Sequence, residues 1–139
     1  MITKIFLALV IVIVIILVAA YLTPRDFRLS KSATIDAPRE KIYDYIRFLK
    51  SQENYSVWVM TDPNIQLQYT GIGGTVGSAS SWTSEMKNVG IGAQEIKALI
   101  PNEAMTVEIR FEKPFKATNF SDIALEDIGE QTKVTNTFY

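Results

Sequence analysis

The chain contains no cysteine and no histidine among its 139 residues. Without cysteine there is no disulfide framework, no thiolate nucleophile and no thiolate metal site, and cysteine usage says nothing about the compartment. Without histidine the chain lacks the commonest general base near neutral pH, the commonest transition-metal ligand and every catalytic triad built on an imidazole. We therefore expect no catalytic residues, no metal site and no cofactor.

An excess of charge of either sign is also missing. The 14 basic and 15 acidic residues give a formal net charge of −1. Nucleic-acid-binding domains carry a basic patch or stripe, so this balance predicts no nucleic-acid partner. The carboxylates of Glu40 and Asp44 are spaced i, i+4, but they fall on the polar side of a predicted helix, where solvation explains them.

What the chain does have is one long apolar run near its N-terminus. Residues 5–22 carry no charged side chain. Eighteen helical residues measure roughly 27 Å, close to the ~30 Å hydrocarbon layer of a bilayer. We predict a transmembrane anchor over residues 1–24, followed by one domain over residues 25–139, so that the membrane is a partner through residues 5–22.

A cleaved signal peptide is the alternative interpretation of this run. Lys4 provides a minimal positive region, and Val18 and Ala20 have the small-residue spacing of a cleavage site. The apolar run continues past that site, which favours the anchor. We expect a single-pass membrane protein.

The side of the membrane on which the domain lies stays open. Arg25, Arg28 and Lys31 follow the span, and by the positive-inside rule they favour a cytoplasmic domain. The very short N-terminal tail gives the opposite indication, that of an exported, signal-anchored domain. Between the two we expect the extracytoplasmic side.

The segment 32–58 begins the predicted domain with a strand and a helix. Asp36 is a helix-capping residue type and Pro38 suits a first helical turn, so a helix is predicted to start within one residue of Asp36. Apolar residues then recur at i, i+3, i+4 and i+7, which predicts one buried stripe. The apolar positions of this helix are Ile42, Tyr45, Ile46 and Leu49.

After this helix the chain is predicted to form mainly strands. Apolar and polar residues alternate between turn residues, most regularly over residues 103–111. The glycine-rich segment 71–77 is predicted to be a turn and not a phosphate-binding loop, because a strand pattern follows it instead of a helix. The expected strands are residues 27–35, 65–69, 78–84, 90–100, 103–111, 116–125 and 131–139.

These motifs occur in an order that resembles a known family. The strand ending TIDAP, the helix REKIYDYI, the sequence WVMTDPN at 58–64, the glycines around 74–77 and 90–92, and RFEKPF at 110–115 are similar to the polyketide cyclase/dehydrase-like branch of the SRPBCC, or START/Bet v1-like, superfamily. The resemblance covers residues 27–139. It implies an α+β helix-grip fold: a curved antiparallel sheet of about six to seven strands with one main helix after the first strand, preceded here by a single transmembrane helix.

The resemblance also implies a long C-terminal helix gripped by the sheet. This sequence ends at Tyr139, at the end of a predicted strand. We therefore expect a domain that is C-terminally truncated relative to the family, with a groove covered by a protein partner or by the missing helix.

In such a fold the functional site is the cavity between the sheet and the helix. Inward-facing aromatic side chains and the few polar groups among them are the candidates for lining it. Asn136 is the polar candidate, because it lies between Val134 and Phe138 on an apolar face and needs a hydrogen-bond partner or a ligand there. The ligand-binding candidates are Trp58, Tyr69, Trp82, Phe111, Phe120, Asn136 and Phe138.

The function expected from the sequence is the binding of a small hydrophobic or amphipathic ligand, a lipid among them, by a membrane-anchored START/Bet v1-like domain. One alternative is a polyketide cyclase- or dehydratase-like enzyme, which would have to use Tyr, Asp, Glu, Arg or Lys here. The other is a tethered protein-interaction module whose open groove accepts a helix.

Overall fold

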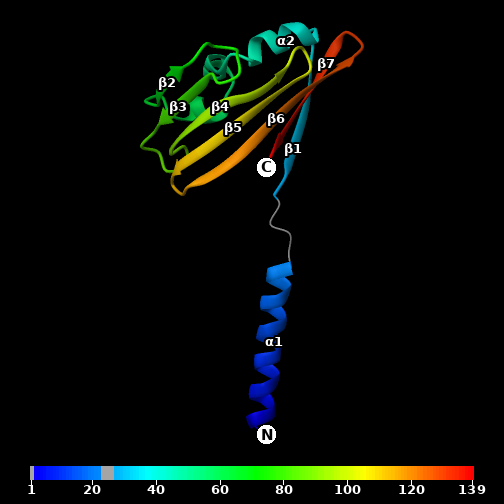
Figure 1. Cartoon of the computed structure of the whole chain (residues 1–139), viewed down its shortest axis with the longest axis vertical. Coiled ribbons are helices and arrows are strands. Elements are labelled where there is room, and N and C mark those ends of the chain that lie inside the picture. Colours follow the sequence, from blue (N-terminus) through cyan, green and yellow to red (C-terminus); the bar gives the residue numbers. More distant parts are fainter. Residues whose placement is uncertain (1, 23–26) are drawn as a thin grey trace.

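The computed structural model describes residues 2–22 and 27–139. An N-terminal helix, α1 (Ile2–Leu22), stands apart from a β-rich domain (Figure 1). Its segment Ile5–Leu22 has a mean hydropathy of 3.4 and none of it is buried. The helix is thus apolar and long enough to span a membrane, and a signal sequence at the same position has the same properties. The predicted boundary at residues 24 and 25 lies outside the described residues.

The domain is built on one antiparallel sheet of seven strands in the order β1-β7-β6-β5-β4-β3-β2 (Figure 1). Each strand after β2 pairs with the one before it, and β1 pairs with β7. This confirms the predicted α+β class and strand number. The strands are β1 (Leu29–Ile35), β2 (Gln66–Thr70), β3 (Ala79–Thr83), β4 (Ile91–Ile100), β5 (Ala104–Lys113), β6 (Ala117–Ile128) and β7 (Gln131–Phe138).

The glycine-rich segment 71–77 connects β2 to β3, so a strand follows it, as predicted. Gly71, Gly74 and Gly77 have φ angles of 78°, 75° and 86°. Only glycine adopts this region without strain, so these residues allow the chain to turn between the two strands.

The register of the strands defines two faces of the sheet, because residues directly opposite each other on antiparallel strands share a face. Val107 lies opposite Ile96 on β4 and opposite Ser121 on β6. We call the face that carries Val107 the concave face and the other one the outer face. The predicted alternation of β5 is confirmed on this point, since Met105 and Val107 are only 1% and 2% exposed.

A bulge in β4 changes one predicted face. The register shifts between Ile96 and Ala98, and a bulge re-aims the residues that follow it. Leu99 therefore lies opposite Met105 and packs on the same core as Ile96. The sequence pattern, read with an uninterrupted period of two, places Leu99 on the opposite face and is wrong there.

Three short helical segments precede β2: α2 (Arg39–Ile46), the 3₁₀ helix η1 (Leu49–Asn54) and α3 (Val57–Thr61). The prediction that α2 starts within one residue of Asp36 is wrong. Its N-cap is Pro38, with no side-chain cap. Helical conformation is unfavourable for the residue that precedes a proline, so the helix begins after Ala37 and Pro38.

The core lies between these helical segments and the concave face. Leu49 of η1 packs on Ile96, Met105 and Val107, and Ile42 and Tyr43 of α2 pack on Leu125 of β6. The predicted helical stripe is therefore partly wrong, because Tyr43 is buried and Tyr45 is 47% exposed. The helix ends at Ile46, so the spacing from Ile42 to Leu49 does not lie on a single helix.

Strand β1 is more exposed than its alternating pattern predicts. All seven of its residues are exposed. It is an edge strand, paired only with β7. The concave face therefore remains open at the β1 side.

Candidate functional site

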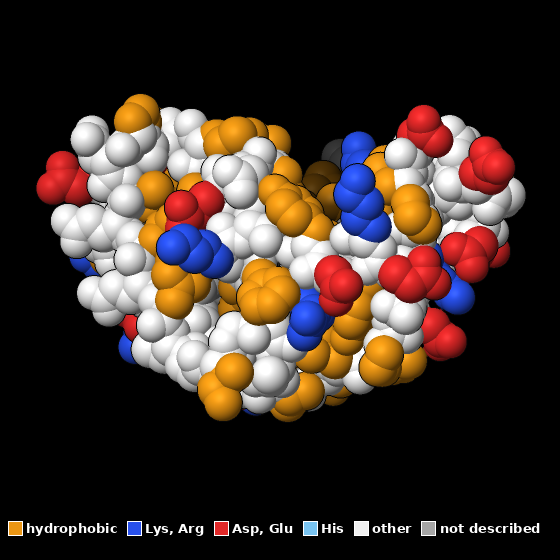
Figure 2. All heavy atoms as spheres, turned by 90° about the horizontal axis from the view of Figure 1, so that it is seen from above, with side chains coloured by type: hydrophobic (Ala, Val, Ile, Leu, Met, Phe, Trp, Pro, Cys, Tyr) orange, Lys and Arg blue, Asp and Glu red, His pale blue; other side chains and the backbone are white. Residues whose placement is uncertain are grey.

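The open part of the concave face is the candidate site. Figure 2 views the domain from above and shows it hollowed between the side that carries β2 and β3 and the side that carries β1 and β7. The floor residues that register places on this face are half-buried or exposed, unlike Met105 and Val107 under η1. We call this region the concave groove and define it by Leu29, Lys31, Ile109, Phe111, Asn119, Ile123, Asn136 and Phe138.

A polar network closes the end of the groove on the β2–β4 side. Gln94 Nε2 donates to Gln52 Oε1 at 2.6 Å and to Ser80 Oγ at 3.0 Å, and Gln52 Nε2 donates back to Gln94 Oε1 at 3.3 Å. The Tyr69 hydroxyl donates to Glu53 Oε1 at 2.7 Å. These bonds join η1 to the sheet, and Tyr69 contacts η1 through its hydroxyl while its side chain stays 39% exposed.

Trp82 and Phe111 form the aromatic pair of the concave face. Their ring centroids are 5.8 Å apart with an edge-to-face angle of 77°, a favoured geometry. The Trp82 indole donates to the Val89 carbonyl at 3.2 Å. Gly92 lies opposite both residues, and a Cβ there would approach the Trp82 ring to 2.4 Å and the Arg110 carbonyl oxygen to 2.6 Å. The absence of a side chain at Gly92 therefore makes room for this pair.

Asn136 has the partner that its position requires. The Ser121 hydroxyl donates to Asn136 Oδ1 at 2.8 Å, and Ser121 itself is buried. Asn136 lies on the same face as Val134 and Phe138, as predicted, with Lys31 directly opposite on β1. Its amide nitrogen forms no hydrogen bond within residues 2–22 and 27–139.

Phe120 does not line the groove, which corrects the prediction. It lies opposite Glu108, whereas the concave residues Val107 and Ile109 lie opposite Ser121 and Asn119. On the outer face its ring stacks on Tyr139, with centroids 5.8 Å apart.

Trp58 lies outside the sheet altogether. It belongs to α3 and is 64% exposed. The structure therefore places Tyr69, Trp82, Phe111, Asn136 and Phe138 on one face, with Tyr69 exposed at its β2 edge, and leaves Trp58 and Phe120 apart from them.

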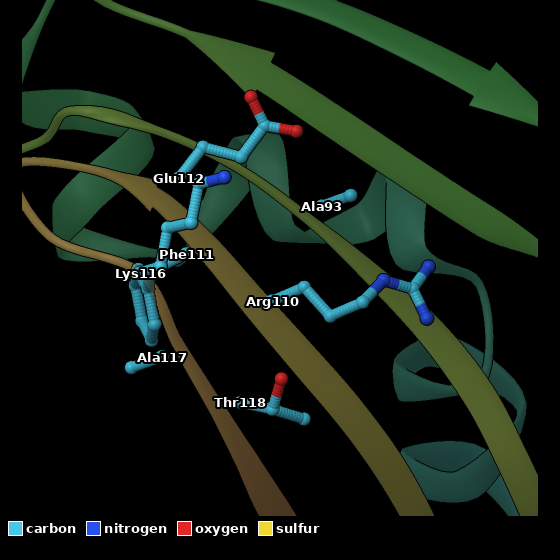
Figure 3. Close-up of a pocket in the computed structure, with 7 residues that line it drawn as sticks. All are labelled: Ala93, Arg110, Phe111, Glu112, Lys116, Ala117 and Thr118. Atoms are coloured by element: carbon cyan, nitrogen blue, oxygen red, sulfur yellow. The ribbon is translucent and has the colours of Figure 1, made fainter.

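A second hollow lies where β5 ends and β6 begins, and residues of both faces of the sheet line it. A depression of 630 Å³ at the β5–β6 end is lined by Ala93, Arg110, Phe111, Glu112, Lys116, Ala117 and Thr118. Figure 3 shows the Arg110 guanidinium pointing away from Glu112 and Lys116. Arg110 instead pairs with Glu95 and Glu108. The polar side chains that line the depression do not converge on one point, so we assign no site there.

Two tyrosines beside η1 have raised pKa values. Partial burial, with Tyr45 nearby, raises the pKa of Tyr55 to about 12, although a hydrogen bond with Gln52 opposes the rise. Burial and then the hydrogen bond to Glu53 raise the pKa of Tyr69. A raised pKa keeps a phenol protonated at neutral pH and makes it a poorer general base. Among the described residues, no three acidic side chains gather as a metal site would require.

Comparisons with known proteins identify the fold. No protein-family model matches the chain, and no curated protein matches it either. Among solved structures, the Aha1 dimer from Colwellia psychrerythraea is 20% identical, with a TM-score of 0.58 over 82% of this chain and 76% of that one. Mll3558 from Rhizobium loti is 13% identical, with a TM-score of 0.60 over 81% and 76%.

A third similar structure is Ara h 8.0201, at 13% identity and a TM-score of 0.57 over 81% of this chain and 75% of that one. The chain thus has a Bet v1-like fold. At these identities the likeness concerns the fold alone.

Sequence reasoning did not select several residues that the structure places at the site. Lys31 occupies a concave position. In the alternating pattern of residues 27–35 it is the charged residue among apolar ones, and this signal could have identified it. Gln52 and Gln94 are separated by 42 residues. Without the fold, nothing in the sequence connects them.

Proposed function

We propose that this domain binds a small hydrophobic or amphipathic molecule, with lipids as the leading class, in the concave groove. The observation that carries the proposal is the contrast between the two faces. The concave face carries Ile109, Phe111, Ile123 and Phe138, which are all half-buried, and the domain is hollowed between its two sides (Figure 2). The outer face carries paired charges and hydrogen-bonded hydroxyl groups, and its aromatic residues Phe120 and Tyr139 stack on each other.

The energetic argument is that this apolar floor gains by being covered. Each Å² of apolar surface removed from water contributes about 25 cal/mol. Contiguous apolar patches on a soluble domain usually mark a binding site. Meanwhile Gln94 and Ser80 have their polar groups satisfied internally, so they do not oppose an apolar ligand.

We further propose that α1 is a membrane anchor. Its apolar segment supports this, since eighteen uncharged residues give it the length of a bilayer span. An anchor would hold the groove close to a source of lipids. The domain is proposed to lie on the extracytoplasmic side.

The test is to purify the full chain in a mild detergent without added lipid, extract any bound molecule and identify it by mass spectrometry. A panel of fatty acids, lysolipids and sterols is then screened for shifts of the melting temperature. We expect an amphipathic molecule in stoichiometric amount and a raised melting temperature with its class. A groove repeatedly found empty and no shift across the panel would contradict the proposal, as would a stoichiometric protein partner that resists displacement by lipids.

A further inference from the structure

The concave groove contains a charged position next to its apolar floor. Lys31 on β1 lies opposite Asn136 on β7, and Asn136 lies opposite Ile123 on β6. Residues opposite each other share a face, and Ile123 packs on the core beneath the helices. Lys31 is therefore a cation on the concave face.

The charge of Lys31 has no counterpart in the described part of the chain. Lys31 is exposed, and its side chain forms no ion pair or hydrogen bond within residues 2–22 and 27–139. Asp127, the acid at the end of the concave face of β6, is held by Arg39 at 3.3 Å. On the outer face Lys133, by contrast, has Glu126 at 3.6 Å. Lys31 thus differs from its neighbours in being available to a ligand.

Asn136 adds hydrogen-bond donors beside this charge. Its Oδ1 is taken by the Ser121 hydroxyl at 2.8 Å, which fixes the amide with its nitrogen free. An ammonium and an amide NH₂ side by side match a carboxylate, which accepts through two oxygens. A phosphate monoester carries about −1.5 to −2 charges and would leave its excess charge unpaired at a single lysine.

The floor next to this pair is apolar and long enough for a hydrocarbon chain. Phe138 and Leu29 form the neighbouring pair across β7 and β1. Across the sheet the partly exposed floor runs from β1 over β7 and β6 to Ile109 and Phe111 on β5. Three strand spacings from β1 to β5 measure about 14 Å, and one acyl chain occupies half of the ~30 Å bilayer core, roughly 15 Å.

We propose that the groove takes a long-chain carboxylate of the fatty-acid class. Its carboxylate contacts Lys31 and Asn136, and its tail lies over Phe138 towards Ile109 and Phe111. This inference rests on the proposed function and names the class of ligand for the same groove.

The experiment compares a diazirine-bearing palmitic acid with its methyl ester, which keeps the tail and removes the charge. The full chain is held in phosphatidylcholine nanodiscs at about pH 9, well above the ordinary carboxylate pKa. Cross-linking yield is titrated for each probe and read by mass spectrometry of the intact chain. We expect the acid to bind about tenfold more tightly than the ester, because a charge-assisted hydrogen bond distinguishes them.

Three variants locate the charge. Lys31→Gln is expected to lower the affinity for the acid to that of the ester and to leave ester binding unchanged. Asn136→Asp keeps the acceptor for Ser121 but places a negative charge at the site, so it should weaken acid binding further. Lys133→Gln removes the same charge from the outer face of β7 and should preserve the tenfold difference.

The outcomes separate this inference from the proposed function. Equal affinities for acid and ester in the unmodified chain, or a tenfold difference that survives Lys31→Gln, would overturn the carboxylate site while the hydrophobic groove stands. Saturable binding of neither probe would overturn both.

Discussion

Gln52 of η1 and Gln94 of β4 exchange two side-chain hydrogen bonds, at 2.6 and 3.3 Å. This reciprocal pair joins a helical segment to the sheet across 42 residues of sequence. Both side chains are partly buried, and a partly buried amide that loses its partner remains desolvated. The pair therefore holds η1, and with it Leu49, on the core at the closed end of the groove.

The first prediction concerns this pair. Gln94→Ala leaves the Gln52 amide unpaired and should lower the free energy of unfolding by about 1 to 3 kcal/mol. Urea unfolding of the two single variants and the double variant measures the coupling, with Gln68→Ala on the outer face of β2 as the control. The losses of unfolding free energy in the two single variants are expected not to add up to the loss in the double variant. Additive effects would show that the two amides are independent.

The second prediction ranks the core. Ile96 is fully buried and Ile100 on the same strand is 52% exposed. Ile96→Ala should cost about 2 to 5 kcal/mol, whereas Ile100→Ala should change the free energy of unfolding by about 0.5 kcal/mol or less. Ile46 and Phe111, which their sequence patterns place in the core, are half-buried and should fall between. A cost at Ile100 equal to that at Ile96 would mean that the faces of β4 are misassigned.

The third prediction concerns pH. The Tyr55 pKa rises from an ordinary 10.0 to about 12 in the fold. A raised pKa means that the folded state favours the neutral phenol, so this contribution to stability is complete below about pH 10 and is lost as the pH rises towards 12. Spectrophotometric titration should show a late-ionising tyrosine that Tyr55→Phe removes. If the variant retains every late-titrating phenol, the assignment to Tyr55 fails.

The fourth prediction concerns α1. Deleting residues 1–22 should release the remaining chain from membranes without detergent, because Ile5–Leu22 is the one segment among the described residues that has the length and hydropathy of a span. Fractionation and N-terminal sequencing of the full-length product are the measurements. A mature chain that begins at Tyr21 would show that the apolar run is a cleaved signal peptide.

The sequence predicted the sheet well because alternation is a local property. Residues 103–111 alternate with a period of two, and Met105 and Val107 are buried as that period requires. Alternation fails where the backbone changes phase. The bulge after Ile96 moves Leu99 to the core face, and the sequence carries no distinct signal for it.

The candidate site was predicted less completely, since it depends on faces that pairing alone defines. Phe120 was assigned to the groove on its aromatic character. A shift of one residue exchanges the faces of a strand, and the core positions of Ile123 and Leu125 already imply that Phe120 faces outward. Asn136 was identified because a polar residue among apolar ones is conspicuous, and the same reasoning applied to Lys31 would have identified it too.

The central claim is that ligands bind on the concave face of the sheet, and two phenylalanines test it most directly. Phe138 faces the groove, and Phe120 lies on the outer face; both are half-buried. Phe138→Ser and Phe120→Ser thus remove the same group from opposite sides of the sheet.

The measurement is the dissociation constant of a hydrophobic fluorescent probe for the full chain and both variants in phosphatidylcholine nanodiscs, with empty discs subtracted and folding checked by circular dichroism. We predict that Phe138→Ser weakens binding about tenfold or more, since it removes up to about 1.5 to 3 kcal/mol of burial, and that Phe120→Ser leaves it unchanged. Equal losses in the two variants, or a loss confined to Phe120→Ser, would contradict the account.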